Sequence, residues 1–181
     1  MEPAMACEML QSVLDQVSTL VMDNDSTTIA RVKSTVDKNI RKQCDSNHTK
    51  KGFTASLIEL SKTQKLLRNT KVCSHIERCF SYSISQNKGQ REQLAIGLSS
   101  IIPHLYGEHS SCGTWCMGKE EGYKHKALPY GKPLDDKDLR VALQSLMEKF
   151  IPRSSELANM GSTQSNESFN HMAASKAPKR F

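Results

Sequence analysis

The sequence lacks the features that mark membrane and secreted proteins. No apolar run among its 181 residues is long enough to span a bilayer. The first residues have neither a basic lead nor an apolar core, so they do not form a secretory signal. Internal repeats and low-complexity segments are missing too, which leaves an ordinary globular sequence. We therefore expect a soluble, intracellular chain with no membrane partner.

Charge of both signs is present, with an excess of positive charge. The 25 lysines and arginines outnumber the 19 acidic residues and give a net charge of +6, which favours a polyanionic partner such as DNA or RNA. The hydrophobic content of 37% is sufficient for a packed core. Six cysteines without a secretory signal indicate thiols or metal ligands rather than a disulfide framework.

Hydrophobic periodicity predicts mostly helical structure around one short strand. Residues 5–17 have the pattern of an amphipathic helix, and the apolar run 20–22 predicts a buried strand that ends in an acidic loop. Ser26 can cap a helix that extends to about residue 42 and whose outer face is basic. Further helices are predicted over residues 53–67, 72–84, 93–105 and 139–150, and a last one begins near Glu167. The basic residues of the second helix are Arg31, Lys33, Lys38, Arg41 and Lys42.

Four potential metal ligands lie within thirteen residues, in the pattern His104-x4-His109-x2-Cys112-x3-Cys116. Two imidazoles and two thiolates suit a tetrahedral zinc ion, and four protein ligands leave no open position for catalysis, so the predicted site is structural. The segment 106–133 has few aliphatic residues and needs such support. His125 could replace His104 as a ligand, and a loop of unconnected His and Cys residues is the alternative. Cys7, Cys73 and Cys79 lie on apolar helical faces and are interpreted as core residues.

Acidic residues form further candidate sites. Asp23 and Asp25 follow the predicted strand, where a carboxylate can bind a hard divalent cation, although taken alone the two residues are better explained as an acidic turn that caps the next helix. Asp45 and His48 are three residues apart and share one face of a helical turn, with capping again the alternative. Glu167 shares a helical face with Asn170 and His171, but a Glu in a first helical turn also simply favours the helix dipole.

Taken in order, these motifs resemble the transposase domain of Mutator-like elements, in the branch found in invertebrate genomes. The resemblance covers most of the chain, from about Leu20 to Lys179. It rests on six segments: Val-Met-Asp-Asn-Asp-Ser-Thr-Thr (21–28), Asp-Ser-Asn-His (45–48), the His/Cys segment (104–116), Tyr-Lys-His-Lys-Ala-Leu-Pro-Tyr-Gly-Lys (123–132), Gly-Ser-Thr-Gln-Ser-Asn-Glu-Ser-Phe-Asn (161–170) and Ser-Lys-Ala-Pro-Lys (175–179).

The resemblance implies the C-terminal part of a ribonuclease-H-like core of a DDE transposase, in which two Asp and one Glu bind two Mg²⁺ or Mn²⁺ ions and catalyse DNA cleavage and joining. Asp23 corresponds to the second Asp and Glu167 to the Glu, with Asp25 and Asn170 in support. Asp45 and His48 match the family's "acid or Cys, two residues, His" signature. The fold expected is mostly α, an α/β fragment with a partial core at 1–52, a zinc-stapled helical insertion at 53–152 and a truncated return to the core at 153–181.

The first catalytic Asp of the family has no counterpart, because residues 5–17 offer only Glu8 and Asp15, on a helical pattern. We therefore expect a transposon-derived fragment that is inactive alone. Its expected partner is transposon-end and target DNA, self-association is a further option, and its expected location is the nucleus. Two alternatives stay open: a non-catalytic, zinc-dependent DNA-binding or protein-interaction module, and a helical interaction protein without metal.

Overall fold

The computed structural model describes residues 3–23, 25–113, 115–159, 161, 168 and 172, and it divides into two compact units. One unit comprises residues 1–49 and 161–181, and the other comprises residues 50–160. The described residues are mostly helical, as predicted, and they contain one small parallel sheet. Among them, no helix combines the length and the apolar character that crossing a membrane requires.

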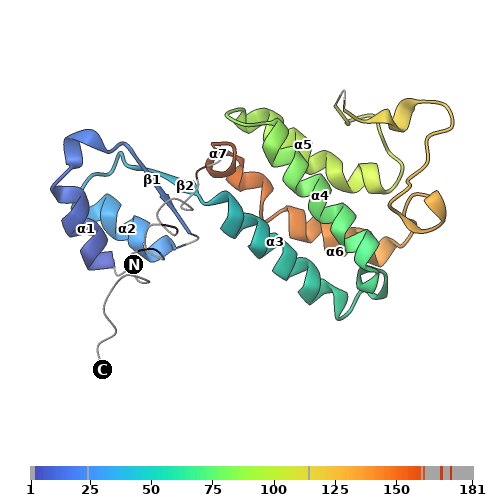
Figure 1. Ribbon diagram of the computed structural model, residues 1–181, viewed down its shortest axis with the longest axis horizontal. Coiled ribbons are helices and arrows are strands. Elements are labelled where there is room, and N and C mark those ends of the chain that lie inside the picture. The colour runs from blue at the N-terminus through green and yellow to red at the C-terminus, as the bar shows by residue number, and fades with distance from the viewer. Residues whose placement is uncertain are drawn as a thin grey trace. The chain divides into compact units, whose positions relative to one another are not determined.

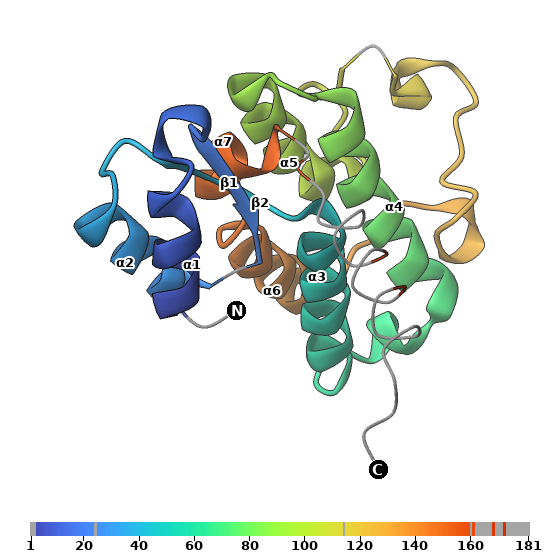
Figure 2. The same ribbon diagram turned by 60° about the vertical axis from the view of Figure 1, so that its left-hand side comes forward.

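The first unit is a β-α-β arrangement preceded by a helix (Figures 1 and 2). Strand β1 (Thr19–Met22) pairs in parallel with β2 (Arg41–Cys44), in a register that joins Thr19 to Arg41 and Met22 to Cys44. Helix α2 (Ser26–Thr35) connects the two strands, and α1 (Pro3–Gln11) packs against α2. The core residues of this unit come from both helices and from the turn before β2: Ala6, Cys7, Leu10, Val32 and Ile40.

Two helices of the first unit are shorter than predicted. Helix α1 ends at Gln11, where Ser12 donates a side-chain hydrogen bond back to the Met9 carbonyl at 2.7 Å, and a 3-10 turn (Leu14–Gln16) follows. Helix α2 ends at Thr35, because the Asp37 carboxylate accepts the Asn39 N–H at 2.8 Å and turns the chain. Arg41 and Lys42, predicted on the outer face of a helix, therefore belong to strand β2, which the hydrophobic pattern did not indicate.

The helix predicted to begin at Phe53 begins seven residues earlier. Helix α3 runs from Ser46 to Ser61, and Asp45 precedes it directly. The predicted boundary between residues 52 and 53 therefore falls inside a continuous helix. Because α3 starts at Ser46, the motif that contains Asp45 and His48 forms the first turn of a helix and joins the end of β2 without a loop.

Helices α4 (Thr70–Gln86), α5 (Arg91–Leu105), α6 (Lys137–Met147) and α7 (Ser154–Leu157) form the second unit together with most of α3 (Figure 1). Its core contains a cluster of three phenylalanines. The rings of Phe53 and Phe80 stack at a centroid distance of 4.0 Å, and Phe150 lies edge-on to both, at 5.5 and 5.1 Å. Edge-on and stacked pairs of this kind stabilise a core beyond the area that they bury.

A long loop, residues 106–136, connects α5 to α6 and is attached at its two ends. The Leu134 N–H donates to the Leu105 carbonyl at 2.9 Å, and the Tyr106 hydroxyl donates to the Asp136 carbonyl at 2.6 Å. Arg140 on α6 forms a bidentate ion pair with Glu108. Between these attachments the loop contains two short 3-10 turns, Met117–Lys119 and Pro129–Gly131, so its centre needs another source of order.

Candidate metal centre and acidic site

The C-terminal turn of α5 and the loop after it bring four potential zinc ligands together. His104 lies on the last turn of α5, ahead of Tyr106, where the helix is capped, and its side chain is buried. His109, Cys112 and Cys116 follow on the loop. One ligand atom from each of these four residues lies within 4.8 Å of every other. The four side chains named by their spacing in the sequence are thus close enough to hold one ion.

The distances within this cluster fit a tetrahedral zinc ion. Usual zinc–sulfur and zinc–nitrogen bond lengths separate a thiolate from an imidazole nitrogen by about 3.6 Å across a tetrahedral edge. The Cys116 sulfur lies 3.4 Å from Nδ1 of both His104 and His109. The Cys112 sulfur lies 3.6 Å from Nδ1 of His104 and 3.9 Å from Nδ1 of His109. Both histidines therefore direct the same ring atom, Nδ1, toward the thiols.

A glycine that the spacing did not single out supports the cluster. The Gly118 N–H donates to the Cys116 sulfur at 3.3 Å, a hydrogen bond that stabilises a thiolate. A Cβ atom at Gly118 would overlap the His109 ring. Residue 118 must therefore be glycine for His109 to keep its place. Sequence reasoning missed this residue because the contact is made through space.

The metal-free protonation states agree with a site that is completed by a cation. Burial, with the neighbouring histidines, lowers the pKa of His104 to about 4, so its imidazole is neutral and able to ligate. Burial, followed by the hydrogen bond to Cys116, raises the pKa of Cys112 to about 12. A divalent cation supplies the positive charge that a second thiolate requires, and its binding therefore releases protons.

The residues around the cluster shield it. Trp115 lies 5.6 Å from His104 between ring centroids and covers one side of that imidazole. The His125 ring stacks on His109 at 5.4 Å, but His125 is outside the group of four.

Cys7 is buried in the core of the first unit, as interpreted. Cys73 and Cys79 on α4 are half-buried, and burial raises the pKa of Cys79 to about 11.

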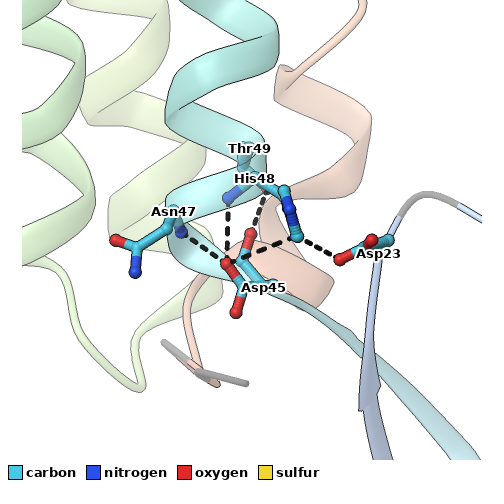
Figure 3. Close-up of polar contacts among 5 residues, drawn as sticks. All are labelled: Asp23, Asp45, Asn47, His48 and Thr49. Atoms are coloured by element: carbon cyan, nitrogen blue, oxygen red, sulfur yellow. Dashed lines mark hydrogen bonds and ion pairs between the residues drawn. The ribbon is translucent and has the colours of Figure 1, made fainter. Parts of the chain in front are cut away.

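The acidic site lies in the first unit, where β1 ends (Figure 3). Asp23 directly follows β1, and its side chain is 57% exposed. Its carboxylate contacts Nδ1 of His48, and the same nitrogen lies 3.9 Å from the Asp45 carboxylate. Figure 3 shows the His48 imidazole between the two carboxylates. The carboxyl end of one strand and the helix after the neighbouring strand thus bring the candidate residues Asp23, Asp45 and His48 together.

Asp25 and Asp45 both cap helices. Asp25 accepts the N–H groups of Thr27 and Thr28 and the Thr28 hydroxyl, and these hydrogen bonds hold its pKa below the ordinary value. Asp25, rather than the predicted Ser26, is therefore the N-cap of α2. Asp45 is buried and accepts the N–H groups of Asn47 and His48 at 2.7 and 2.9 Å, which fixes the first turn of α3. Capping, one of the two interpretations of each motif, is the role that these contacts display.

The C-terminal segment returns to this site at Gly161. Asp45 and Gly161 form a parallel bridge, and the Ser46 N–H donates to the Gly161 carbonyl at 3.1 Å. A Cβ atom at Gly161 would lie 2.6 Å from the Val21 side chain, so a larger residue would disturb β1. The candidate residues Glu167 and Asn170 lie outside the described residues.

The described residues thus define a protein with a His/Cys cluster that could hold a zinc ion and with a carboxylate at the end of a strand. A comparison with known protein families identifies the family of this chain. Residues 1–116 match the Mutator-like transposases. The match covers more than half of the chain and includes Asp23, His48 and all four residues of the His/Cys cluster, so the chain belongs to this family. No curated protein and no solved structure matches the chain.

Proposed function

We propose that this chain is part of a DNA transposase of the invertebrate Mutator-like branch, in which Asp23 binds a catalytic Mg²⁺ or Mn²⁺ ion. One observation carries the proposal: Asp23 lies at the carboxyl end of β1 and contacts His48 of the Asp-x-x-His motif, within the residues that match the family. Functional side chains of α/β sheets gather at this end of the strands. The partially exposed carboxylate of Asp23 offers the oxygen ligand that such ions prefer.

In the local structure around Asp23, Asp45 and His48 have different roles. The Asp45 carboxylate fixes the first turn of α3, and this turn directs His48 toward Asp23. Helix α2 and the parallel pairing of β1 with β2 fit a fragment of a ribonuclease-H-like core. In that core Glu167 supplies the final carboxylate, and Gly161, six positions before it, lies beside Asp45. Asp23 and Glu167 would help to hold the two metal ions, which would supply activation of the attacking hydroxyl and stabilisation of the leaving oxygen.

We expect these 181 residues by themselves not to cleave DNA. Two-metal chemistry needs several converging carboxylates. Among the described residues, only Asp45 joins Asp23 around His48, and Asp45 is buried and already accepts two backbone N–H groups. The first Asp of the family has no counterpart here, and a site with only two of the three carboxylates, Asp23 and Glu167, should bind divalent cations weakly. Metal-dependent nicking of DNA that requires Asp23 would contradict this expectation.

Zinc has a structural role in this proposal. The four ligands satisfy the ion completely, so no position is left for a reacting water. The ion would order the loop that connects α5 to α6, and the hydrolytic chemistry belongs to the carboxylate-bound ions of the other unit. DNA is the expected partner of the protein, and self-association is a further option. The protein is expected in the nucleus, because its DNA substrate is there.

The proposal is tested by binding of Mn²⁺ to Asp23, measured by electron paramagnetic resonance on the 181-residue chain. Asp23→Asn should abolish the weak site. Asp25→Asn removes the same charge two positions away and keeps a side chain that caps helices well, so it should leave the site intact. Equal binding by the wild-type chain and Asp23→Asn would overturn the role of Asp23.

A non-catalytic, zinc-dependent DNA-binding module is the alternative, and the His/Cys cluster favours it, because its four residues lie close enough to hold a zinc ion without any catalytic carboxylate. Duplex binding separates the two functions. Salt-dependent binding that survives both Asp23→Ala and Glu167→Ala, in a chain that binds no Mn²⁺, would support the module.

A further inference from the structure

A cleft lies beside the His/Cys cluster and has no part in the proposed chemistry. Its volume is about 970 Å³, and it is formed by one face of α4, by His104 at the end of α5 and by the loop that follows α5. Ligand pockets of the size of a nucleotide or a drug-like molecule commonly measure several hundred to about 1,000 Å³. The residues that matter most for its chemistry are Arg78 and Tyr82 on α4, and Trp115, Tyr123 and Lys124 on the loop.

Aromatic rings are the first unusual feature of this cleft. Trp115 is 40% exposed and Tyr82 is 42% exposed, although both are large apolar side chains. Their rings lie edge to face, with centroids 5.7 Å apart, and Trp115 is also in contact with the ligand His104. Gly113 permits this arrangement, since a Cβ atom there would lie 2.9 Å from the indole nitrogen. Trp115 and Tyr82 therefore form an exposed aromatic wall beside the His/Cys cluster.

A second, more basic hollow adjoins the first. It measures about 580 Å³ and shares Arg78, Lys126 and Ala127 with the aromatic cleft. Lys71, Thr70 and Ser74 complete its lining, so three cations and two hydroxyl groups surround it without any acidic residue. The aromatic cleft differs, because Glu120 and Glu121 also line it. A phosphate is thus attracted to the second hollow and repelled from the acidic part of the first.

We propose that the two hollows together bind an unpaired nucleotide of single-stranded DNA, with the base in the aromatic cleft and the phosphate in the basic hollow. Every base has a flat face that stacks on Trp or Tyr, and lysines and arginines neutralise the backbone. The bases of an intact duplex are stacked on one another and cannot enter such a cleft. The proposal rests on the proposed function, because the DNA would be a strand end or an extruded base that transposition exposes.

Fluorescence of the zinc-loaded 181-residue chain tests this site directly. Trp115 is the single tryptophan, so its emission reports on stacking in the cleft. A short single-stranded oligothymidylate should quench it, and a blunt duplex should quench it far less at equal occupancy, as measured by anisotropy of a labelled strand. Equal quenching by both forms, or none by either, would overturn the proposal. Stronger binding of an RNA strand than of the matching DNA strand would overturn the assignment to DNA.

Substitutions locate the base and the phosphate separately. Trp115→Ala and Tyr82→Ala should each weaken single-strand binding about five-fold to a hundred-fold, the usual range for one stacked base. Tyr130→Ala is the matched control, because Tyr130 lies on the same loop, is 96% exposed and lines neither hollow. Lys126→Ala should weaken binding and reduce its salt dependence, whereas Lys132→Ala, outside both hollows, should do neither.

Two further measurements keep the outcomes distinct. Tyr82 lies on α4 and is outside the group of four candidate ligands, so Tyr82→Ala remains informative if Trp115→Ala loses zinc. Unchanged single-strand affinity in Tyr82→Ala, with zinc retained, would overturn the proposal. Asp23→Asn should not alter the quenching of Trp115. A chain that binds Mn²⁺ through Asp23 but shows no quenching would refute this site alone, whereas quenching without Mn²⁺ binding would refute only the role of Asp23.

Discussion

At the scale of single residues, the His/Cys cluster depends on groups that bind no metal. Gly118 is in contact with two of the ligands, since its N–H donates to Cys116 and its missing side chain leaves room for His109. Such neighbours orient ligands and commonly change metal affinity by about 10-fold to 100-fold when they are replaced. Gly118 therefore contributes both space for the His109 ring and a hydrogen bond to Cys116. Replacement by alanine, which adds only a methyl group, is enough to test the contribution of this space.

We therefore expect Gly118→Ala to weaken zinc binding by about 10-fold to 100-fold, because the added methyl group displaces the His109 ring. Competition with a chromogenic chelator measures the change. Gly52→Ala is the control, since a Cβ atom at Gly52 in α3 meets no atom within 4 Å and should only favour the helix. Zinc affinity in Gly118→Ala equal to that of Gly52→Ala would show that His109 is not a ligand.

At the scale of elements, the attachment of the loop to α6 depends on two acidic residues. Asp136 is the N-cap of α6 and accepts the Leu139 N–H at 2.9 Å, and its own carbonyl accepts the Tyr106 hydroxyl. Glu108 binds Arg140 one turn further along the helix, and the Arg140 guanidinium lies 5.0 Å above the Tyr106 ring. Helix α6 and its N-cap therefore anchor the segment that contains the candidate zinc ligands.

Removal of the cap should destabilise this anchor. We expect Asp136→Ala to lower the free energy of unfolding by about 1 kcal/mol, because the Leu139 N–H loses its partner. Asp136→Asn keeps an oxygen acceptor at the cap and should cost much less. Chemical denaturation followed by circular dichroism measures both variants. An equal loss in the two would indicate that charge, rather than capping, is the contribution of Asp136.

The ion pair between Glu108 and Arg140 should make the attachment sensitive to acid. The hydrogen bonds that the Glu108 carboxylate accepts from Arg140 lower the pKa of Glu108 from its ordinary value of 4.5. A carboxylate with a lowered pKa adds stability that is complete above the ordinary value and is lost as the pH falls through the lowered value. A double-mutant cycle with Glu108→Gln and Arg140→Met should give a favourable coupling at neutral pH that vanishes in strong acid. A coupling that persists in acid would contradict this origin.

The elements also show what the sequence can and cannot predict. The periodicity of α4 and α6 is local, and their predicted bounds are close to those observed. Strand β2 reads Arg-Lys-Gln-Cys, without apolar alternation, and it is a strand only because β1 offers it parallel partners. The ligand cluster was predictable because its four residues are neighbours in sequence. The roles of Gly118 and Gly161 arise from contacts with His109 and Val21, which only the folded chain reveals.

At the scale of the whole molecule, the two units have separate means of stability. The first unit has an aliphatic core around Val32 and Ile40, and the helices of the second enclose the cluster of Phe53, Phe80 and Phe150. The loop between α5 and α6 has little apolar support of its own, with Leu128 and Leu134 buried near its C-terminal end. Its centre is therefore the part of the molecule whose order should depend most on a metal ion.

We expect chelation of zinc to release this loop and to leave both cores folded. Far-ultraviolet circular dichroism should change little, since the helices that enclose the phenylalanines contain no ligand except His104. Trp115 emission should shift to longer wavelength, because Trp115 loses its contact with a fixed His104. Limited proteolysis should cut the loop first.

Cys112→Ser should reproduce this state without a chelator. Cys79→Ser replaces a thiol on α4 outside the ligand group and should retain one zinc ion per chain. Cooperative loss of the helical signal on chelation would instead mean that the ion supports the whole second unit, and zinc retained by Cys112→Ser would remove Cys112 from the ligand set.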